Sequence, residues 1–486
     1  MIRLIPAPHT TTMTDARVAV VPVFTAEAVF ADAASTLAEY ARRTHGVILT
    51  EGLAKGAGGI TFTADPSLPA EGYVLTVTAD GAAIKAADCE GAQHAAVTVI
   101  QLMEKDGDSL TLPVGTVEDA PKCTYRTVMI DLARDWHELH VLYEYVDMCC
   151  FYKVRYLHLH FTDDQSYTLP SKAFPGLSTE GRHYTEEEIK GLLAYAKSRG
   201  VQIVPEIDVP GHTSSFSAAY GDIFGRDGII CLSEESMEAM STLFRELCEL
   251  FADSDYIHMG GDEAFIDRWT TCEKCLSALR RDGVDVDKYL TDDKSRHDLA
   301  EIMYATFVKR ICEVILSCGK TPVVWEGFHE DTNHMIPREA LIISWENYYQ
   351  TTPQLMKAGF RLVNGSWAPM YIVTPKRYWT PEEVYNWSIY TWQPVHPKSP
   401  YAGRSLTIEP TEQVEGGMLL AWGDWIMPSY PDNLAEGVRE EQRLVEERVP
   451  CLTENVWNRV KPTDWTEFSG RMAQVAELYE AFRNNK

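Results

Sequence analysis

Two adjacent carboxylates, Asp262 and Glu263, are the residues whose types best suit acid–base chemistry. They follow a Gly-Gly pair in the segment HMGGDE (258–263), directly after a short apolar run. Neighbouring side chains on a regular strand point to opposite faces, but glycines allow a sharp turn that brings both carboxylates to one pocket. One carboxylate raises the pKa of the other, and we expect this effect to keep Glu263 protonated near neutral pH. An isolated Asp-Glu pair would instead indicate a solvated acidic loop.

Other ionisable and aromatic residues also stand at the ends of apolar runs. Asp131 and Arg134 follow one run, the segment HLHFTDDQ (158–165) another, and PEIDVPGHT (205–213) a third. Aromatic residues end or follow the remaining runs: Trp325, Trp345, Trp367, Tyr371 and Trp422. Aromatic rings suit the C–H surfaces of a sugar, and carboxylates suit its hydroxyls and proton transfer. The combination predicts a carbohydrate site.

The elements that must position these residues are short apolar runs alternating with helical segments. Near-continuous Val, Ile and Leu runs indicate strands buried on both faces, as in a parallel sheet covered by helices. Amphipathic stretches at 184–200 and 233–252 predict two of those helices. Eight runs favour an α/β fold of the (β/α)8 TIM-barrel type, whose active site lies at the carboxyl ends of the strands; an open doubly wound sheet is the alternative. The runs are 127–133, 155–161, 201–208, 255–261, 321–326, 341–346, 361–366 and 417–422.

The first 120 residues have a different pattern. Residues 59–67 and 72–87 alternate apolar and polar in the manner of strands, whereas 91–104 has a helical pattern. The change after Ala120-Pro121 predicts a small α+β domain at 1–120 and a barrel domain at 121–486. A closing helix is expected in the tail from about residue 465.

Composition excludes several classes of partner. The 486 residues include 71 acidic and 44 basic side chains, a formal charge of −27. Nucleic acids and anionic membranes attract basic patches, so we expect neither as a partner. No apolar stretch approaches the roughly 20 residues of a membrane helix, and the N-terminus lacks the apolar core of a secretory signal. The sequence carries no signal for an oligomeric state.

The eleven cysteines are odd in number and scattered, which favours free thiols in a reducing cytosol. We therefore expect a cytoplasmic protein. Cys272 and Cys275 form the only C-x-x-C, and no second pair lies at zinc-ribbon spacing. The preferred interpretation is two structural thiols, with a metal or redox role as the alternative. No metal or cofactor is expected.

Three segments together resemble the family 20 glycoside hydrolases, the β-N-acetylhexosaminidases. The family pattern H-x-G-G-D-E stands here as HMGGDE (258–263), H-x-H-x-T-D-D-Q as HLHFTDDQ (158–165), and P-E-I-D-x-P-G-H-T as PEIDVPGHT (205–213). Their order and spacing agree from about residue 122 to 430, and residues 1–120 resemble the small α/β domain that often precedes this barrel. The resemblance implies a retaining exo-hydrolase acting on terminal non-reducing β-linked GlcNAc or GalNAc of a glycan or glycoconjugate.

The resemblance also implies catalytic roles. Glu263 would be the general acid and later the base, and Asp262 would orient the substrate acetamide and support positive charge on it. Tyr371 would hydrogen-bond the acetamide oxygen as that oxygen attacks C1 and forms an oxazolinium ion, the substrate-assisted route among retaining glycosidases. Asp163 and His212 would form a relay behind Glu263, with His212 between the two carboxylates.

Substrate-binding roles are implied in the same way. Trp325, Trp345 and Trp422 would box the acetamide and the sugar ring; core packing is the alternative for any one of them. Arg134 would grip the O3 and O4 hydroxyls, and a structural ion pair is its alternative. Asp424, Asp164 and His160 complete the expected substrate-binding set. We expect one of His158 and His160 to face the barrel interior and the other to face the helices.

The chain departs from the family pattern on one side of the expected sugar site. Val373 stands where many members have Asp or Asn, and Asp424 replaces the Glu of W-x-E. Ser166-Tyr167-Thr168 replaces an aromatic and an Arg that often follow D-D-Q. These positions hold the O4 and O6 side of the sugar, so the choice of hexosamine stays open. The segment 374–410, with Tyr378, Trp379, Trp387 and Trp392, is either a wall beyond the scissile bond or a packed loop.

Two rival functions remain. The first is a metal-dependent hydrolase, because H-x-H at a barrel strand end is also a zinc pattern. Those sites prefer H-x-H on the first strand, whereas His158 and His160 lie on the second predicted strand. The second is a glycan-binding module without activity. Asp262, Glu263 and Tyr371 disfavour it, because a lectin has no use for a positioned acid.

Overall fold

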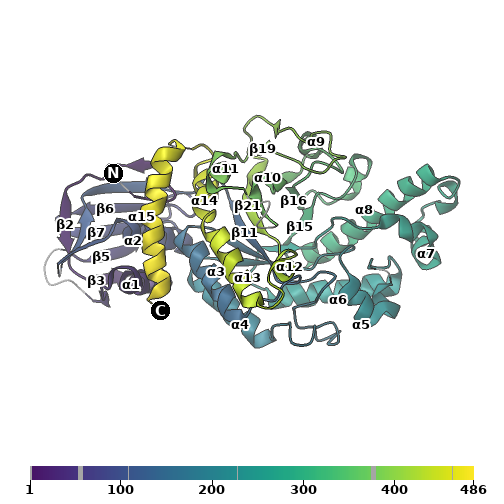
Figure 1. Ribbon diagram of the computed structural model, residues 1–486, viewed down its shortest axis with the longest axis horizontal. Coiled ribbons are helices and arrows are strands. Elements are labelled where there is room, and N and C mark those ends of the chain that lie inside the picture. The colour runs from purple at the N-terminus through teal and green to yellow at the C-terminus, as the bar shows by residue number, and fades with distance from the viewer. Residues whose placement is uncertain are drawn as a thin grey trace.

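A closed eight-stranded parallel barrel forms the centre of the protein (Figure 1). The computed structural model describes residues 3–52, 58–107, 109–226, 228–373, 379–461 and 463–485. The last barrel strand pairs in parallel with the first, so that Thr127 lies opposite Met418 and the barrel closes. The strands, in spatial order, are β11 (Tyr125–Asp131), β12 (Tyr156–His160), β13 (Gln202–Glu206), β14 (Tyr256–His258), β15 (Thr321–Trp325), β16 (Leu341–Ser344), β17 (Arg361–Asn364) and β21 (Val414–Ala421).

The barrel confirms the fold class expected from the sequence. Every residue of β11, β12 and β16 is buried, as continuous apolar runs in a helix-covered parallel sheet require. Each of the eight expected runs overlaps one barrel strand. A short ninth strand, β18 (Tyr371–Ile372), pairs in parallel with β21 outside the closed ring, Tyr371 lying opposite Leu420.

Helices follow most barrel strands. The two expected helices appear as α4 and α6, and the Thr185 side chain accepts a hydrogen bond from the Glu188 N–H in a capping box that starts α4. Between β15 and β21 the described helices have six residues or fewer, so the helical sequence pattern of that stretch is weak. The helices are α3 (Leu139–Phe151), α4 (Glu186–Ser198), α5 (Ser214–Phe224), α6 (Glu234–Leu250), α7 (Glu273–Arg281), α8 (Asp293–Ser317), α9 (Thr352–Lys357), α10 (Trp367–Met370), α11 (Pro381–Asn386), α12 (Ile426–Ser429), α13 (Leu434–Glu446) and α14 (Val449–Asn458).

Before the barrel, a seven-stranded mixed sheet and a three-stranded sheet accompany α1 (Ala31–His45) and α2 (Cys89–Leu102). The expected boundary at residues 120 and 121 falls between β10, which ends at Asp119, and β11, which begins at Tyr125. The strands are β1 (Thr10–Thr11), β2 (Arg17–Val20), β3 (Val23–Ala26), β4 (Thr50–Glu51), β5 (Ile60–Ala64), β6 (Tyr73–Thr78), β7 (Gly81–Ala86), β8 (Glu104–Asp106), β9 (Ser109–Pro113) and β10 (Gly115–Asp119).

The C-terminal helix α15 (Trp465–Asn484) lies beside the N-terminal region, far along the sequence from it (Figure 1, yellow). The ring of Phe482 is 4.4 Å from that of Tyr40 in α1, and Arg43 Nε donates a hydrogen bond of 3.0 Å to the Phe482 carbonyl. The helix expected from about residue 465 is therefore present. The sequence groups this helix with the barrel domain, but it also packs against α1 of the N-terminal region.

Short elements complete the described chain: η1 (Ala28–Phe30), η2 (Ile266–Thr271), η3 (Val286–Lys288), η4 (Glu330–Met335), β19 (Thr391–Trp392) and β20 (Leu406–Thr407). Among the described residues no helix combines the length and apolar character needed to span a bilayer. All eleven cysteines have free thiols.

Candidate active site

A pocket of about 450 Å³ opens at the carboxyl ends of the barrel strands. It is within the size range of ligand-binding pockets. Three groups of residues line it: acids, one arginine and a set of aromatic and apolar side chains. They are Arg134, Asp262, Glu263, Trp345, Trp367, Tyr371, Val373, Trp422, Asp424 and Trp425. Asp262, Glu263 and Tyr371 therefore face one common space.

The Gly-Gly pair creates the turn that carries the two acids. Gly260 has φ +73° and Gly261 has φ +110°, backbone conformations that disfavour other residues. A Cβ atom on Gly260 would lie 1.8 Å from Oδ1 of Asp208, the oxygen that accepts a 3.2 Å hydrogen bond from the Gly261 N–H. Glu263 also has a positive φ, +46°, so the turn continues through the catalytic candidate.

Asp262 is buried, and its Oδ1 has no hydrogen-bond partner among the described residues. Burial raises the pKa of Asp262 to about 6; the His212 charge opposes this rise and the Glu263 charge adds to it. An unpaired buried carboxylate oxygen is costly, so such an atom at a pocket wall indicates a place for a ligand donor.

Glu263 behaves differently from the sequence-based expectation. Its side chain is 56% exposed, and interaction with His212 lowers the pKa of Glu263 against a smaller opposing effect of burial. The expectation that Asp262 would raise the pKa of Glu263 is therefore wrong for the free protein. The charge of His212 outweighs that of the neighbouring carboxylate, and Asp262 is the acid whose pKa rises.

His212 lies between Asp163 and Glu263. Its Nδ1 is 3.3 Å from Oδ1 of Asp163, and its Nε2 is 3.5 Å from Oε2 of Glu263. Burial alone would lower the pKa of His212, but the surrounding carboxylates, Asp163 and Glu263 first, raise it well above its ordinary value. Burial likewise would raise the pKa of Asp163, but His160, His212 and the Arg134 charge hold it far below the usual range. The structure thus brings the three members of the expected relay together.

Arg134 is held by two buried carboxylates. Its guanidinium is 3.0 Å from Oδ2 of Asp131 and 2.8 Å from Oδ2 of Asp163, and it lies 4.9 Å from the ring centroid of Trp422. Asp424 lines the same part of the pocket, and burial raises its pKa despite the opposing Arg134 charge. Arg134 therefore has a structural ion pair and also reaches the pocket.

Tyr371 sits in an aromatic stack. Its ring is 4.6 Å from that of Trp367 and 6.4 Å from that of Trp345, nearly parallel to the latter at 13°. Burial and the charge of Asp262 raise the pKa of Tyr371 well above its ordinary value, so the phenol stays neutral and can donate a hydrogen bond.

A buried glutamate, Glu326, holds the turn that carries Trp345. Its carboxylate accepts backbone N–H bonds from Trp345 (3.3 Å), Asn347 (2.9 Å) and Tyr348 (2.7 Å), and its carbonyl accepts the Trp345 indole N–H at 3.0 Å. Burial raises the pKa of Glu326 to about 8 even though these bonds oppose the rise. The sequence interpretation gave Glu326 no role, although it ends the fifth apolar run.

Trp325 lies beneath the pocket and is not among its lining residues. It is 1% exposed, and its indole N–H donates a 2.6 Å hydrogen bond to Oε1 of Glu206. Core packing, the alternative considered for each strand-end tryptophan, therefore describes Trp325. Trp345 and Trp422 do line the pocket.

His158 and His160 both point to the barrel interior. Their ring nitrogens are 3.0 Å and 2.7 Å from Oε2 of Glu206, and both side chains are fully buried. The expectation that they face opposite sides is wrong, because residues two apart on a strand share a face. His160 also contacts Asp163 at 3.0 Å, so it supports the relay from below and does not line the pocket.

Asp164 is exposed and also stands away from the pocket lining. Its Oδ1 accepts a 2.9 Å hydrogen bond from the Ser214 N–H, the first residue of α5. In the segment 374–410, Trp387 and Trp392 are buried, which favours a packed loop, whereas Tyr378 falls outside the described residues.

The sequence interpretation missed Trp425 as a pocket residue and assigned no role to Trp367 or Asp208. Trp425 follows Trp422 closely and its buried indole nitrogen has no hydrogen-bond partner among the described residues. Burial and the Asp262 charge raise the pKa of Asp208 well above its ordinary value. Trp425, Trp367 and Asp208 could have been found because each lies within a few residues of a predicted site residue in the sequence.

The histidine cluster bears on the metal-dependent rival. Potential ligand atoms of His158, Glu206 and His258 lie within 4.8 Å of one another, all fully buried. None of the three is among the residues lining the pocket. A metal ion held by these three residues would not contact a substrate in the pocket, which disfavours this rival for the His158 cluster alone. Potential ligand atoms of His212, Asp262 and Glu263 also lie within 4.8 Å of one another, and Asp262 and Glu263 line the pocket.

Comparison with known proteins identifies the family. The sequence model for the catalytic domain of glycosyl hydrolase family 20 matches residues 123–435, well over half of the chain, and the model for domain 2 of that family matches residues 1–120. The chain belongs to glycosyl hydrolase family 20.

Individual family 20 proteins show how far the likeness extends. A β-hexosaminidase of Akkermansia muciniphila is 30% identical over 344 residues, 64% of this chain and 66% of that protein. The human β-hexosaminidase subunit beta is 26% identical over 62% of this chain and 55% of its own length. The chain thus matches a little over half to two thirds of the length of these two relatives.

Solved structures share the fold over essentially the whole chain. The exo-β-N-acetylglucosaminidase of Vibrio harveyi, solved with N-acetylglucosamine, has a TM-score of 0.80 at 21% identity and covers 100% of this chain and 78% of its own. The β-N-acetylhexosaminidase of Streptomyces coelicolor has a TM-score of 0.76 at 23% identity, covering 99% of this chain and 96% of its own. Both place the family 20 fold on this chain.

Proposed function

We propose that the protein is a retaining exo-β-N-acetylhexosaminidase that releases terminal non-reducing β-linked GlcNAc or GalNAc from glycans. The observation that carries this proposal is the buried, unpaired Oδ1 of Asp262 in a pocket shared with Glu263 and Tyr371. An acetamide N–H is the donor that this oxygen requires, and a phenol is the donor that the acetamide carbonyl requires. Family membership and the names of the relatives support the same activity.

The first step uses the substrate's own acetamide as nucleophile. Protonated Glu263 donates its proton to the glycosidic oxygen as the acetamide carbonyl oxygen bonds to C1 and the C1–oxygen bond breaks. Asp262 accepts the acetamide N–H and stabilises the positive charge of the oxazolinium ion, while Tyr371 aligns the carbonyl. An intramolecular nucleophile held in this way gains on the order of 7–11 kcal/mol over a bimolecular encounter.

The second step opens the ring. The Glu263 carboxylate removes a proton from water, whose oxygen attacks C1 and displaces the acetamide carbonyl. Two inversions at C1 give net retention, without a glycosyl-enzyme bond. The exposure of Glu263 at the pocket mouth supports this role, because the leaving group and then water must reach it from solvent.

The remaining lining residues would bind the sugar. Arg134 and Asp424 supply charged partners for hydroxyls, and Trp345, Trp422 and Tyr371 supply apolar faces. Val373 gives one wall no donor or acceptor, so we propose that no hydrogen bond specifies the hydroxyl opposite it. That feature supports acceptance of both GlcNAc and GalNAc.

We propose a cytosolic location. The eleven free thiols support it, since oxidising compartments favour disulfides. Fractionation of cells that carry the full native gene checks the location, and recovery of the protein only outside the cytosol would contradict it.

Hydrolysis of aryl β-GlcNAc and aryl β-GalNAc, followed by NMR of the released anomer, tests the activity. We expect turnover of at least one substrate, a β product first, and competitive inhibition by a thiazoline analogue of the oxazolinium ion. Glu263→Gln should lose turnover, and Asp164→Asn is the matched control because Asp164 stands outside the pocket lining. A Glu263→Gln variant that turns over substrate as fast as wild type would contradict the role of Glu263 as the acid, and a wild type that turns over neither substrate would support a binding module. Turnover that the thiazoline leaves untouched would contradict the substrate-assisted route.

A further inference from the structure

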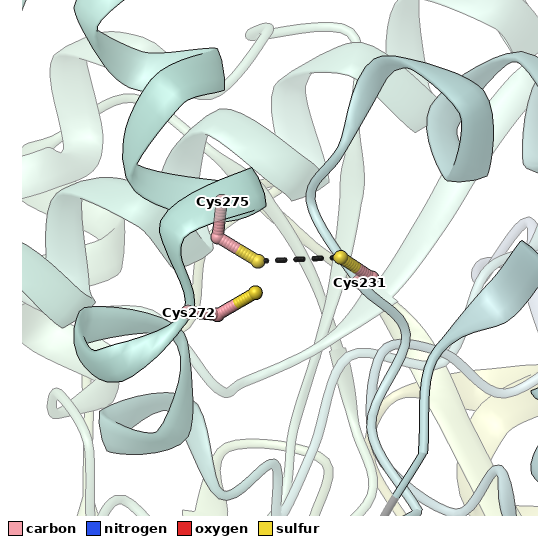
Figure 2. A group of neighbouring side chains, drawn as sticks. All are labelled: Cys231, Cys272 and Cys275. Atoms are coloured by element: carbon pink, nitrogen blue, oxygen red, sulfur yellow. Dashed lines mark hydrogen bonds between the residues drawn. The ribbon is translucent and has the colours of Figure 1, made fainter. Parts of the chain in front are cut away.

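Three cysteines, Cys231, Cys272 and Cys275, form a cluster (Figure 2). None of them is among the residues that line the pocket containing Asp262 and Glu263. Cys231 comes from the loop before α6, Cys272 is the residue immediately before α7, and Cys275 lies in the first turn of α7. All three Sγ atoms lie within 4.8 Å of one another. The fold therefore gives the C-x-x-C of the sequence a third thiol from a distant segment.

The geometry points to a bound zinc ion: we propose that Cys231, Cys272 and Cys275 are three thiolate ligands of one Zn²⁺. Zinc takes Cys sulfur at about 2.3 Å in tetrahedral geometry, which sets neighbouring sulfurs about 3.8 Å apart. The Sγ atoms of Cys231 and Cys275 are 3.4 Å apart. A disulfide requires about 2.05 Å, so the spacing is closer to that of shared metal ligands.

Nearby groups suit thiolates. The backbone N–H of Leu232 points at Sγ of Cys275 at 3.4 Å, a donor that stabilises negative sulfur. Cys272 and Cys275 lie at the amino end of α7, where the helix dipole favours negative charge. Arg268 and Lys274 line the adjoining cavity of about 320 Å³ together with the cysteines. Cationic side chains there complement the single negative charge of a zinc tris-thiolate.

The fourth ligand would come from the cavity. Cys275 is buried, whereas Cys231 and Cys272 are partly exposed to the cavity that all three line. A water molecule entering from this side completes the tetrahedron.

The site would join two loops that carry catalytic candidates. Cys272 and Cys275 follow Glu263 in the chain. Cys231 is next to Ile230, whose N–H donates a 3.0 Å hydrogen bond to the carbonyl of Pro210, two residues before His212. Trp269 links the same loops by donating its indole N–H to the Ile230 carbonyl at 2.8 Å. Zinc would therefore crosslink the segment that follows Glu263 to the loop that contacts the His212 segment, and so help to position both side chains.

Metal content of the full chain, purified with reductant and without chelator, tests the proposal directly. We expect about one zinc per chain by plasma mass spectrometry, because three cysteines whose sulfur atoms already lie within 4.8 Å of one another need little rearrangement to bind the ion. Cys272→Ser and Cys231→Ser should lose most of this zinc. Cys89→Ser is the control, because Cys89 is exposed and lies outside the cluster.

Cobalt substitution gives a second readout that needs neither turnover nor a stable variant. Wild-type protein stripped of metal and titrated with Co²⁺ should develop the visible bands of tetrahedral cobalt and near-ultraviolet thiolate charge transfer. Absence of zinc from reduced wild-type protein, together with no cobalt spectrum, would overturn the proposal. So would a mass showing the loss of two hydrogens and a Cys231–Cys275 crosslink in freshly purified protein. All of these outcomes are independent of glycosidase activity.

Discussion

The imidazole Nε2 of His212 lies 3.5 Å from a carboxylate oxygen of Glu263. The other ring nitrogen faces Asp163, so a protonated His212 stands between two carboxylates. A proton moved from His212 to Glu263 makes a neutral carboxylic acid without a change in the total charge of the group. The proton that Glu263 needs in its proposed role as general acid is therefore held by the His212 imidazole in the free protein.

His212→Gln removes this stored proton. In wild type the carboxylates raise the pKa of His212 well above its ordinary value, so the group keeps its proton to high pH. In the variant only Glu263 itself holds the proton, and the basic limb of the kcat/KM profile should move to lower pH. Rates from about pH 4 to 10 on an aryl glycoside measure the limb. An unchanged basic limb would show that Glu263 obtains its proton independently of His212.

Asp262→Asn should separate activity from stability. The pKa of Asp262 is raised to about 6 in the fold, so this group stabilises the fold below its unfolded value of 3.8 and loses that contribution as pH rises through 6. Asn carries no such penalty, and the variant should be more stable than wild type by roughly 2–3 kcal/mol above pH 6, with the difference vanishing near pH 4. Urea unfolding at both pH values measures it.

The same variant should lose about 10²–10³ in kcat, as expected for loss of an aligned transition-state partner. In wild type kcat/KM should fall as pH drops through about 6, because a protonated Asp262 no longer supports the positive intermediate. A variant that is less stable than wild type at every pH would contradict the assignment of the raised pKa.

Gly260→Ala should disrupt the turn that carries the acids. The added Cβ would meet Oδ1 of Asp208 at 1.8 Å, at a φ of +73°. We expect a loss of about 2–4 kcal/mol in unfolding free energy together with a large fall in kcat. Gly470→Ala is the matched control, because a Cβ there meets nothing within 4 Å and the residue lies inside α15. That change should stabilise by about 0.5–1 kcal/mol.

Substitution of Trp367 should affect substrate binding, whereas substitution of Trp325 should affect the stability of the fold. Trp367→Ala removes a pocket wall and the stacking partner of Tyr371, so KM and the thiazoline inhibition constant should rise about tenfold. Trp325→Phe leaves an oxygen of buried Glu206 without its indole donor and should cost about 1–3 kcal/mol of stability. A larger KM effect for Trp325→Phe than for Trp367→Ala would contradict the placement of Trp325 beneath the pocket.

The barrel could be predicted from sequence because its strands are buried on both faces, which leaves uninterrupted apolar runs. The long helix α8 and the N-terminal α1 were not identified, and the weak pattern between the later strands reflects very short helices there. The acids could be located because strand ends in a parallel barrel share one rim.

Position in the sequence did not reveal how deeply a side chain is buried or which distant residues it contacts. Trp325 and Trp345 both follow apolar runs, yet one bonds to Glu206 below the pocket and the other lines it. The pKa order of Asp262 and Glu263 depends on His212, whose distance from either acid no local pattern gives. Nothing in the spacing of Cys272 and Cys275 indicated that Cys231 would join them.

The contact between α15 and α1 has a consequence for biosynthesis. Tyr40 is fully buried in the finished protein, with Phe482 against its ring. Residues 465–484 leave the ribosome after both the N-terminal sheet and the barrel, so the side of the Tyr40 ring that Phe482 covers stays exposed while those parts fold. The nascent chain therefore presents part of an aromatic side chain to chaperones, or to its neighbours, until residues 465–484 have been synthesised.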